Sequence, residues 1–273
     1  MESSQEQIFK NGSKTFFYST LFFPRIAKKE VTVLYAFVRV VDDYVDSTPA
    51  DSLGFKSFKD KYESSILGIK ANNPIIDDFV ILQKKYNFDQ IWINAFFSAM
   101  ESDLSLQFCK NFGDTEKYMY GSAEVIGLMM CKILNIPHEA YPYARKLGQA
   151  FQYINFIRDI YEDEKLGRLY LPEEHVLKSG IHKLSMETTK ANKISFTNFL
   201  RKEIRYFYVL VDEAQIGFKF IPTRYRIPIM IATNLYIYTA KVIELNPFVV
   251  YQEKVKPDKS RIFFEALKVV IKI

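Results

Sequence analysis

The stretch from Gln152 to Pro172, QYINFIRDIYEDEKLGRLYLP, constrains the fold of this chain more than any other. If it forms a helix at about 100° per residue, Asn155, Asp159 and Asp163 stack their oxygen-bearing side chains on successive turns. Gln152 falls in the same sector of about 80°. Aligned carboxylates repel one another unless a cation lies between them, and hard oxygen ligands suit Mg²⁺. The alternative interpretation is a solvated acidic face.

A second cluster of the same kind lies upstream, in Asp42-Asp43-Tyr44-Val45-Asp46. On the helix predicted from Glu30 to Asp46, four polar or aromatic side chains fall within about 60° of one another. They are Tyr35, Arg39, Asp42 and Asp46. An apolar stripe of Leu34, Phe37, Val41 and Val45 would pack inside. Two such clusters favour a metal site over solvation, with Asp42, Asp46, Asn155, Asp159 and Asp163 as candidate ligands.

Other candidates each have a second interpretation. Lys14 and Thr15 could bind an anion or cap a helix. The small residues of Gly121-Ser-Ala-Glu-Val-Ile-Gly127, with Ala123 among them, admit either a ligand or a closely packed helix. Tyr236 could hydrogen-bond a diphosphate or be a buried structural tyrosine. Lys254 lies in a basic segment that could face a diphosphate or be a solvated tail.

The remaining features bound the class of protein. Hydrophobic residues make up 48% of the 273 residues, with 10 Gly and 10 Pro, and strand-like alternation is missing. We therefore expect an all-α protein that forms a single domain over residues 1–273. A net charge of +5 without a basic stripe argues against nucleic acid as a partner. The polar N-terminus and the lack of a long apolar run predict a cytoplasmic protein, with peripheral membrane contact left open.

At these residues the sequence resembles the squalene/phytoene synthase family, the head-to-head prenyl diphosphate synthases. The match to the family's second signature is Gly148, Gln152, Asn155, Arg158-Asp159, Glu162-Asp163, Arg168, Tyr170 and Pro172. The Gly-Ser-Ala-x-Val-Ile-Gly wording at 121–127 resembles its first signature and leans toward the phytoene branch. Looser matches extend the resemblance from about Ser13 to Arg261.

The resemblance implies an isoprenoid-synthase-type helical bundle around a central cavity. It implies a transferase that joins two geranylgeranyl diphosphates 1′-1 through a cyclopropylcarbinyl diphosphate to phytoene, in carotenoid biosynthesis. Two or three Mg²⁺ ions, or Mn²⁺, would assist. The implied catalytic residues are Tyr35, Arg39, Asp42, Asp46, Asp159 and Asp163. The implied binding residues for diphosphate and prenyl chain are Lys14, Thr15, Phe16, Arg39, Gly121, Ala123, Gly127, Gln152, Asn155, Arg158, Tyr236 and Lys254.

Two alternatives stay open at this point. A squalene or dehydrosqualene synthase would act on two farnesyl diphosphates, and only the squalene type would need NADPH. A non-catalytic family member would serve as an assembly factor or peripheral membrane scaffold. The sequence leaves the oligomeric state, the substrate chain length and the role of Glu124 undecided.

Overall fold

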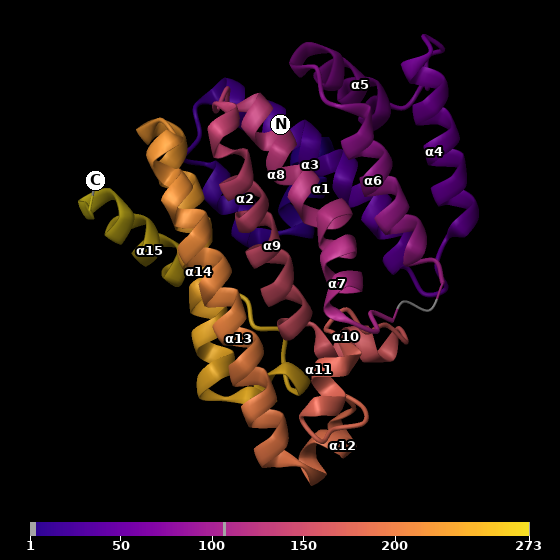
Figure 1. Cartoon of the computed structure of the whole chain (residues 1–273). Coiled ribbons are helices and arrows are strands. Elements are labelled where there is room, and N and C mark those ends of the chain that lie inside the picture. The colour runs from indigo at the N-terminus through magenta and orange to yellow at the C-terminus, as the bar shows by residue number, and fades with distance from the viewer. Residues whose placement is uncertain (1–3, 106–107, 273) are drawn as a thin grey trace.

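A computed structural model of the chain describes residues 4–105 and 108–272 (Figure 1). Its first half contains helices α1 (Ser4–Gly12), α2 (Lys14–Thr20), α3 (Arg25–Asp46), α4 (Ser52–Ile66), α5 (Pro74–Tyr86), α6 (Gln90–Ser102), α7 (Phe112–Met119), a π-helix η1 (Tyr120–Glu124) and α8 (Val125–Ile133). The second half contains η2 (His138–Ala140), α9 (Tyr141–Arg158), α10 (Ile160–Lys165), α11 (Glu173–Lys178), α12 (Met186–Ala191), α13 (Lys193–Gln215), η3 (Ile216–Phe220), α14 (Thr223–Leu245), η4 (Pro247–Tyr251) and α15 (Lys259–Lys272).

The prediction of an all-α protein is confirmed. Within residues 4–105 and 108–272 the only β pairing is an isolated bridge between Phe108 and Leu169. No helix in these described ranges is both long enough and apolar enough to cross a bilayer.

The helix boundaries follow from local sequence signals. The Asp51 side chain accepts a hydrogen bond from the Gly54 backbone at the start of α4, and Asn73 caps α5 in the same way. Asn111 and Asp114 form a reciprocal capping box at the start of α7. Such side chains satisfy backbone N–H groups that have no partner within the helix.

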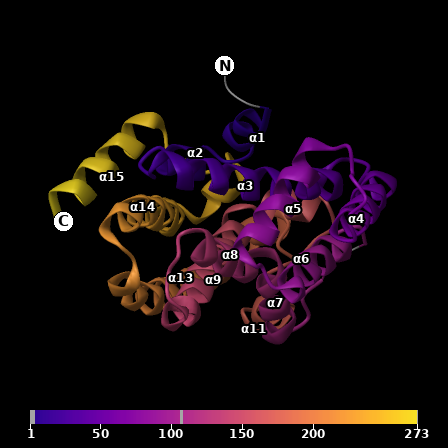
Figure 2. The same cartoon turned by 90° about the horizontal axis from the view of Figure 1, so that it is seen from above.

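Helix α9 runs through the middle of the bundle, with α13, α8 and η1 packed around it (Figures 1 and 2). Its Tyr153, Ile154 and Ile157 are fully buried in the main core. The same core takes in the apolar stripe predicted on α3, whose Leu34 and Val41 are at most 1% exposed. Helix α3, which carries the first aspartate cluster, and α9, which ends just before Asp159, are therefore both anchored by their apolar faces.

One predicted element is interrupted. The sequence indicates a continuous helix from near Glu139 to Gly167, but α9 ends at Arg158 and α10 begins at Ile160. Asp159 between them has φ −97° and ψ 11°, away from helical values. The Asp163 N–H still donates to the Asp159 carbonyl at 2.9 Å, so the turn spacing is kept. Gly167, at φ 69°, lies just beyond α10 and adopts the left-handed conformation that commonly follows a helix end.

Candidate active site

The first aspartate cluster is held by an arginine on its own helix. Arg39 Nη1 lies 2.6 Å from Asp42 Oδ2, and Nη2 lies 2.5 Å from Asp43 Oδ1. These i, i+3 and i, i+4 contacts are what one helical face provides. Burial, and then the charge of Asp46, raise the pKa of Asp42 to about 7 although Arg39 opposes the shift. Arg39 alone therefore does not offset the burial and the crowding of negative charge at Asp42.

The second cluster is clamped by two cations. Arg158 donates to Asp159 through Nε at 2.7 Å and Nη2 at 2.6 Å. Lys254 Nζ lies 3.3 Å from Asp159 Oδ1 and also contacts Glu162. Burial favours the neutral acid, but Arg158 and Lys254 outweigh it and hold the pKa of Asp159 below its ordinary value. Lys254, 95 residues further along the chain, thus lies at the second cluster.

The two clusters converge at Asp46 and Asp163. Burial and the neighbouring Asp159 raise the pKa of Asp163 well above its ordinary range, and the charge of Asp46 adds to that rise. Asp46 is the last residue of α3, whereas Asp163 lies on α10. Carboxylates from both motifs are therefore close enough to repel one another, which is the arrangement that a bound cation would relieve.

An aromatic wall adjoins these polar groups. The ring centroids of Phe151 and Tyr236 are 4.4 Å apart, and Phe16 lies 5.6 Å from Phe151 and 5.7 Å from Tyr236. These three rings come from α9, α14 and α2. Burial, opposed by Arg39, raises the pKa of Tyr35 above its ordinary value, and nearby Tyr236 adds to it. The three rings thus form an apolar wall beside the charged side chains.

Asn155 connects the aromatic wall to the aspartates. Its side chain hydrogen-bonds with the buried Tyr236 hydroxyl. Its buried Oδ1 has no hydrogen-bond partner among the described residues. An unpaired buried oxygen is costly unless a ligand satisfies it. Gln152 lies one turn earlier on the same helix and is half-buried.

The remaining predicted residues have mixed placements. Gly121 abuts α6, where an added Cβ would lie 2.4 Å from the Ala95 carbonyl oxygen. Gly127 abuts α9, where an added Cβ would lie 2.8 Å from the Ala144 carbonyl oxygen. A Cβ added at Gly148 of α9 would in turn lie 2.8 Å from the Ala123 carbonyl oxygen. These small residues lie at helix contacts, which favours the packing interpretation, and their predicted place in a prenyl cavity stays a prediction. The side chains of Lys14 and Thr15 lie outside the described part of the structure.

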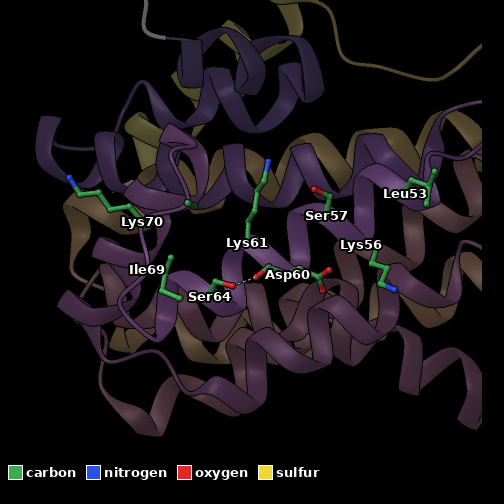
Figure 3. A pocket seen from close by; sticks show the side chains of 9 residues that line it. Leu53, Lys56, Ser57, Asp60, Lys61, Ser64, Ile69 and Lys70 are labelled. Atoms are coloured by element: carbon green, nitrogen blue, oxygen red, sulfur yellow. Dashed lines mark hydrogen bonds between the residues drawn. The ribbon is translucent and has the colours of Figure 1, made fainter.

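Two surface pockets differ in their relation to this site. The larger, about 510 Å³, lies along α4 and contains Lys56, Lys61 and Lys70 but none of the predicted residues (Figure 3). The smaller, about 260 Å³, is lined by Arg158, Tyr161, Glu162 and Lys254 among others. We take the smaller one as the part of the site open to solvent, because it exposes the cations that clamp Asp159.

A divalent cation fits the donor set of the site. Every candidate ligand offers oxygen, two clusters repel each other, and the Asn155 Oδ1 is unpaired. Across the described residues, no three His, Cys, Asp or Glu side chains converge tightly enough to enclose an ion. The carboxylates instead contact four cations, which are Arg39, Arg158, Arg168 and Lys254. Binding would therefore exchange these cations for the metal.

Sequence reasoning missed the importance of three buried charged residues. Asp103 is 5% exposed and accepts hydrogen bonds from Tyr118 at 2.6 Å and Tyr170 at 2.7 Å. Arg168 was only a motif match. Glu124 is 1% exposed, with Arg145 Nε at 2.6 Å and Gln149 Nε2 at 2.7 Å. The sequence signal that was available for Asp103 is Tyr170 of the Arg168-x-Tyr170-x-Pro172 motif, whose hydroxyl donates to it.

The fold is a helical bundle that brings two aspartate motifs together. The match to the squalene/phytoene synthase family model covers residues 9–261. The chain belongs to that family, whose members are prenyltransferases of the phytoene/squalene synthase type.

Named relatives and solved structures agree with this assignment. The chain is 27% identical over 268 residues to a chloroplastic phytoene synthase of an Oncidium hybrid cultivar, covering 93% of this chain and 64% of the relative. It is 27% identical to the phytoene synthase of Rhodobacter capsulatus, and the match covers 86% of this chain and 70% of that relative. The chain thus spans less than two thirds of the plant relative. A dehydrosqualene synthase solved with a ligand shares the fold, with a TM-score of 0.88 and 21% sequence identity. The match covers 98% of this chain and 94% of the synthase.

Proposed function

We propose that this protein is a Mg²⁺-dependent phytoene synthase that joins two geranylgeranyl diphosphates head to head. The observation that carries the proposal is the meeting of the two aspartate motifs at Arg168. Its Nη1 lies 2.7 Å from Asp46 Oδ1, and its backbone N–H donates to the Asp163 carbonyl at 2.8 Å. The names of the relatives favour the phytoene reaction over other reactions of the family. Arg39, Arg158 and Lys254, already beside the carboxylates, would turn toward the substrate's phosphate oxygens.

The candidate ligands are Asp42, Asp46, Asn155, Asp159 and Asp163. Bound Mg²⁺ would neutralise the charge that develops on the diphosphate as its C–O bond breaks. The Asn155 Oδ1, buried and unpaired, is ready to accept such an ion without losing a protein hydrogen bond. Asp42, whose pKa is raised to about 7 by burial and by Asp46, would become fully ionised when the ion binds.

The protein's own groups then have two tasks. The rings of Phe16, Phe151 and Tyr236 would exclude water from the allylic cation and present their faces to it. Attack by the double bond of the second substrate, with loss of a proton, closes the three-membered ring of the cyclopropylcarbinyl diphosphate. A second ionisation releases the other diphosphate, and rearrangement with loss of a second proton gives phytoene. Tyr35, close to Arg39 and Tyr236, would lie between the diphosphate groups and the hydrocarbon.

A second candidate is a farnesyl-diphosphate enzyme of the dehydrosqualene or squalene type. It is favoured by the fold match to a dehydrosqualene synthase and to a squalene synthase from Alicyclobacillus acidocaldarius, at TM-scores 0.88 and 0.78. The two candidates differ in substrate length and, for squalene, in the delivery of hydride from NADPH.

A product assay separates the candidates. Purified protein is incubated with Mg²⁺ and either geranylgeranyl or farnesyl diphosphate, with and without NADPH, and hydrocarbons are identified by mass. A forty-carbon product without NADPH supports the phytoene reaction. A thirty-carbon product overturns it in favour of the second candidate. No product from folded protein, together with no Mg²⁺ binding by calorimetry, favours a non-catalytic scaffold.

A further inference from the structure

The C-terminal helix α15 presents large apolar side chains to solvent. The exposed fractions are 71% for Phe263, 51% for Phe264, 46% for Leu267, 53% for Val270 and 76% for Ile271. At about 100° per residue these five fall within a sector of about 120°. We call them the α15 outer face. An exposed apolar face of this kind in a folded protein marks a site of contact with a partner or a membrane.

The opposite side of α15 is already used for packing. Ile262, Ala266 and Val269 are buried in a small core with Ile231 and Leu235 of α14. Figures 1 and 2 place α15 at the edge of the molecule, outside α14. The outer face therefore points away from the bundle, and the helix does not need it for its own attachment.

A second exposed apolar segment lies near this edge. Leu21 and Phe22, between α2 and α3, are exposed by 50% and 44%, and Ile26 in the first turn of α3 is exposed by 73%. The intervening Phe23 contacts Tyr225 at the start of α14, with ring centroids 6.2 Å apart. Helix α15 also contacts both α14 and α2. The outer face and this segment thus belong to one side of the molecule.

The charge of this side is mostly positive. Residues 21–29, 223–227 and 259–272 contain nine Lys and Arg residues and one acidic residue, Glu265, against 37 and 32 in the whole chain. Glu265 is buried and paired with Arg261 at 2.8 Å and Lys268 at 3.2 Å. A two-fold contact between copies would bring this cationic side against itself. An anionic surface complements it instead.

We propose that the α15 outer face, with Leu21, Phe22 and Ile26, docks on an anionic phospholipid membrane. The apolar side chains would enter the boundary between headgroups and acyl chains, while surrounding cations such as Arg25, Lys29 and Lys268 meet the phosphates. This inference goes beyond the proposed function, because it rests on a surface outside the candidate active site. A membrane would also receive a hydrocarbon product.

The test is co-sedimentation with vesicles. The full chain is mixed with vesicles of equal parts phosphatidylcholine and phosphatidylglycerol, and separately with pure phosphatidylcholine. The test variant combines Phe263→Gln, Leu267→Gln and Val270→Gln. The control variant removes three apolar side chains elsewhere that are even more exposed, through Leu53→Gln, Leu67→Gln and Ile194→Gln, which are 81%, 83% and 81% exposed.

We expect the wild type and the control variant to bind the anionic vesicles and the test variant to bind at least about tenfold less. Binding to pure phosphatidylcholine should be at least about tenfold weaker. A second variant, Arg25→Glu with Lys29→Glu, leaves α15 untouched and should weaken only the anionic binding. Circular dichroism checks that each variant keeps its helix content.

Three results would overturn the proposal. The wild type stays in the supernatant with anionic vesicles, or the test variant sediments as the wild type does. Alternatively, the wild type is a dimer by analytical ultracentrifugation that the test variant dissociates, without vesicle binding; the face then belongs to a second copy. Because sedimentation needs no turnover, failure here is separate from failure of the product assay.

Discussion

Arg168 Nη1 lies 2.7 Å from Asp46 Oδ1, and this ion pair joins the two aspartate motifs across 122 residues of sequence. The same guanidinium donates through Nη2 to the backbone carbonyls of Val45 at 2.6 Å and Asp103 at 3.1 Å. The Arg168 backbone N–H donates to the Asp163 carbonyl at 2.8 Å. With its side chain 6% exposed, Arg168 fixes the end of α3 relative to α10.

Arg168→Lys should therefore damage both stability and activity. Lysine keeps the charge but cannot form the fork of hydrogen bonds. We expect about 1–3 kcal/mol lower free energy of unfolding in urea and at least about tenfold lower kcat in the product assay. The matched control is Lys178→Met, which breaks an exposed pair with Glu174 at 2.7 Å and should change stability by less than about 0.5 kcal/mol. Wild-type stability in the Arg168 variant would contradict the tethering role.

Asp159→Asn should abolish turnover while preserving the fold. The amide keeps the shape of the side chain but removes a charged oxygen ligand, and Arg158 and Lys254 lose their carboxylate partner. The measurement is product formation with Mg²⁺, alongside Mg²⁺ affinity by calorimetry and a thermal melt. Asp60→Asn on the exposed side of α4 serves as control. Near-normal turnover in Asp159→Asn would refute its assignment to the metal site.

The buried Asp103 predicts that the difference in unfolding stability between the wild type and the Asp103→Asn variant depends on pH. Burial raises its pKa to about 6 in the folded state, against hydrogen bonds from Tyr118 and Tyr170 that lower it. The folded state then binds a proton that the unfolded chain releases near its ordinary value, so stability falls as pH rises through this window. Asp103→Asn lacks this titration.

The stability of Asp103→Asn relative to the wild type should accordingly rise from about pH 4.5 to pH 7, by about 2 kcal/mol. Urea unfolding of both proteins at the two pH values measures it. The charge of Asp103 is one of the causes that raise the pKa of Asp42, so that pKa falls in the variant and changes the difference in the same direction. A constant difference across the range would show that Asp103 is ionised throughout.

Gly121→Ala tests whether this glycine serves packing or the substrate. A Cβ there would lie 2.4 Å from the Ala95 carbonyl oxygen and 2.7 Å from the Ala99 Cβ, so the helices must move apart. We expect a loss of about 1–3 kcal/mol of unfolding free energy. Ser57→Ala on the exposed side of α4 is the control. Unchanged stability with a raised KM would instead support a place in the prenyl cavity.

The sequence determined the local geometry of the site. Spacings of three and four residues fix which side chains share a helical face, so Arg39 beside Asp42 and the apolar stripe of Leu34 and Val41 could be predicted before any tertiary contact was known. The motif wording identified the family in the same way, because it needs no coordinates.

Only the tertiary structure decided which distant groups meet. Arg168 with Asp46, Tyr170 with Asp103, and Lys254 with Asp159 lie 122, 67 and 95 residues apart in sequence. Such contacts depend on the path of the whole chain. The outer face of α15 was likewise undecided, since helical periodicity shows an apolar sector but not which sector another helix covers. Local rules fix what a helix presents, and packing alone fixes what meets it.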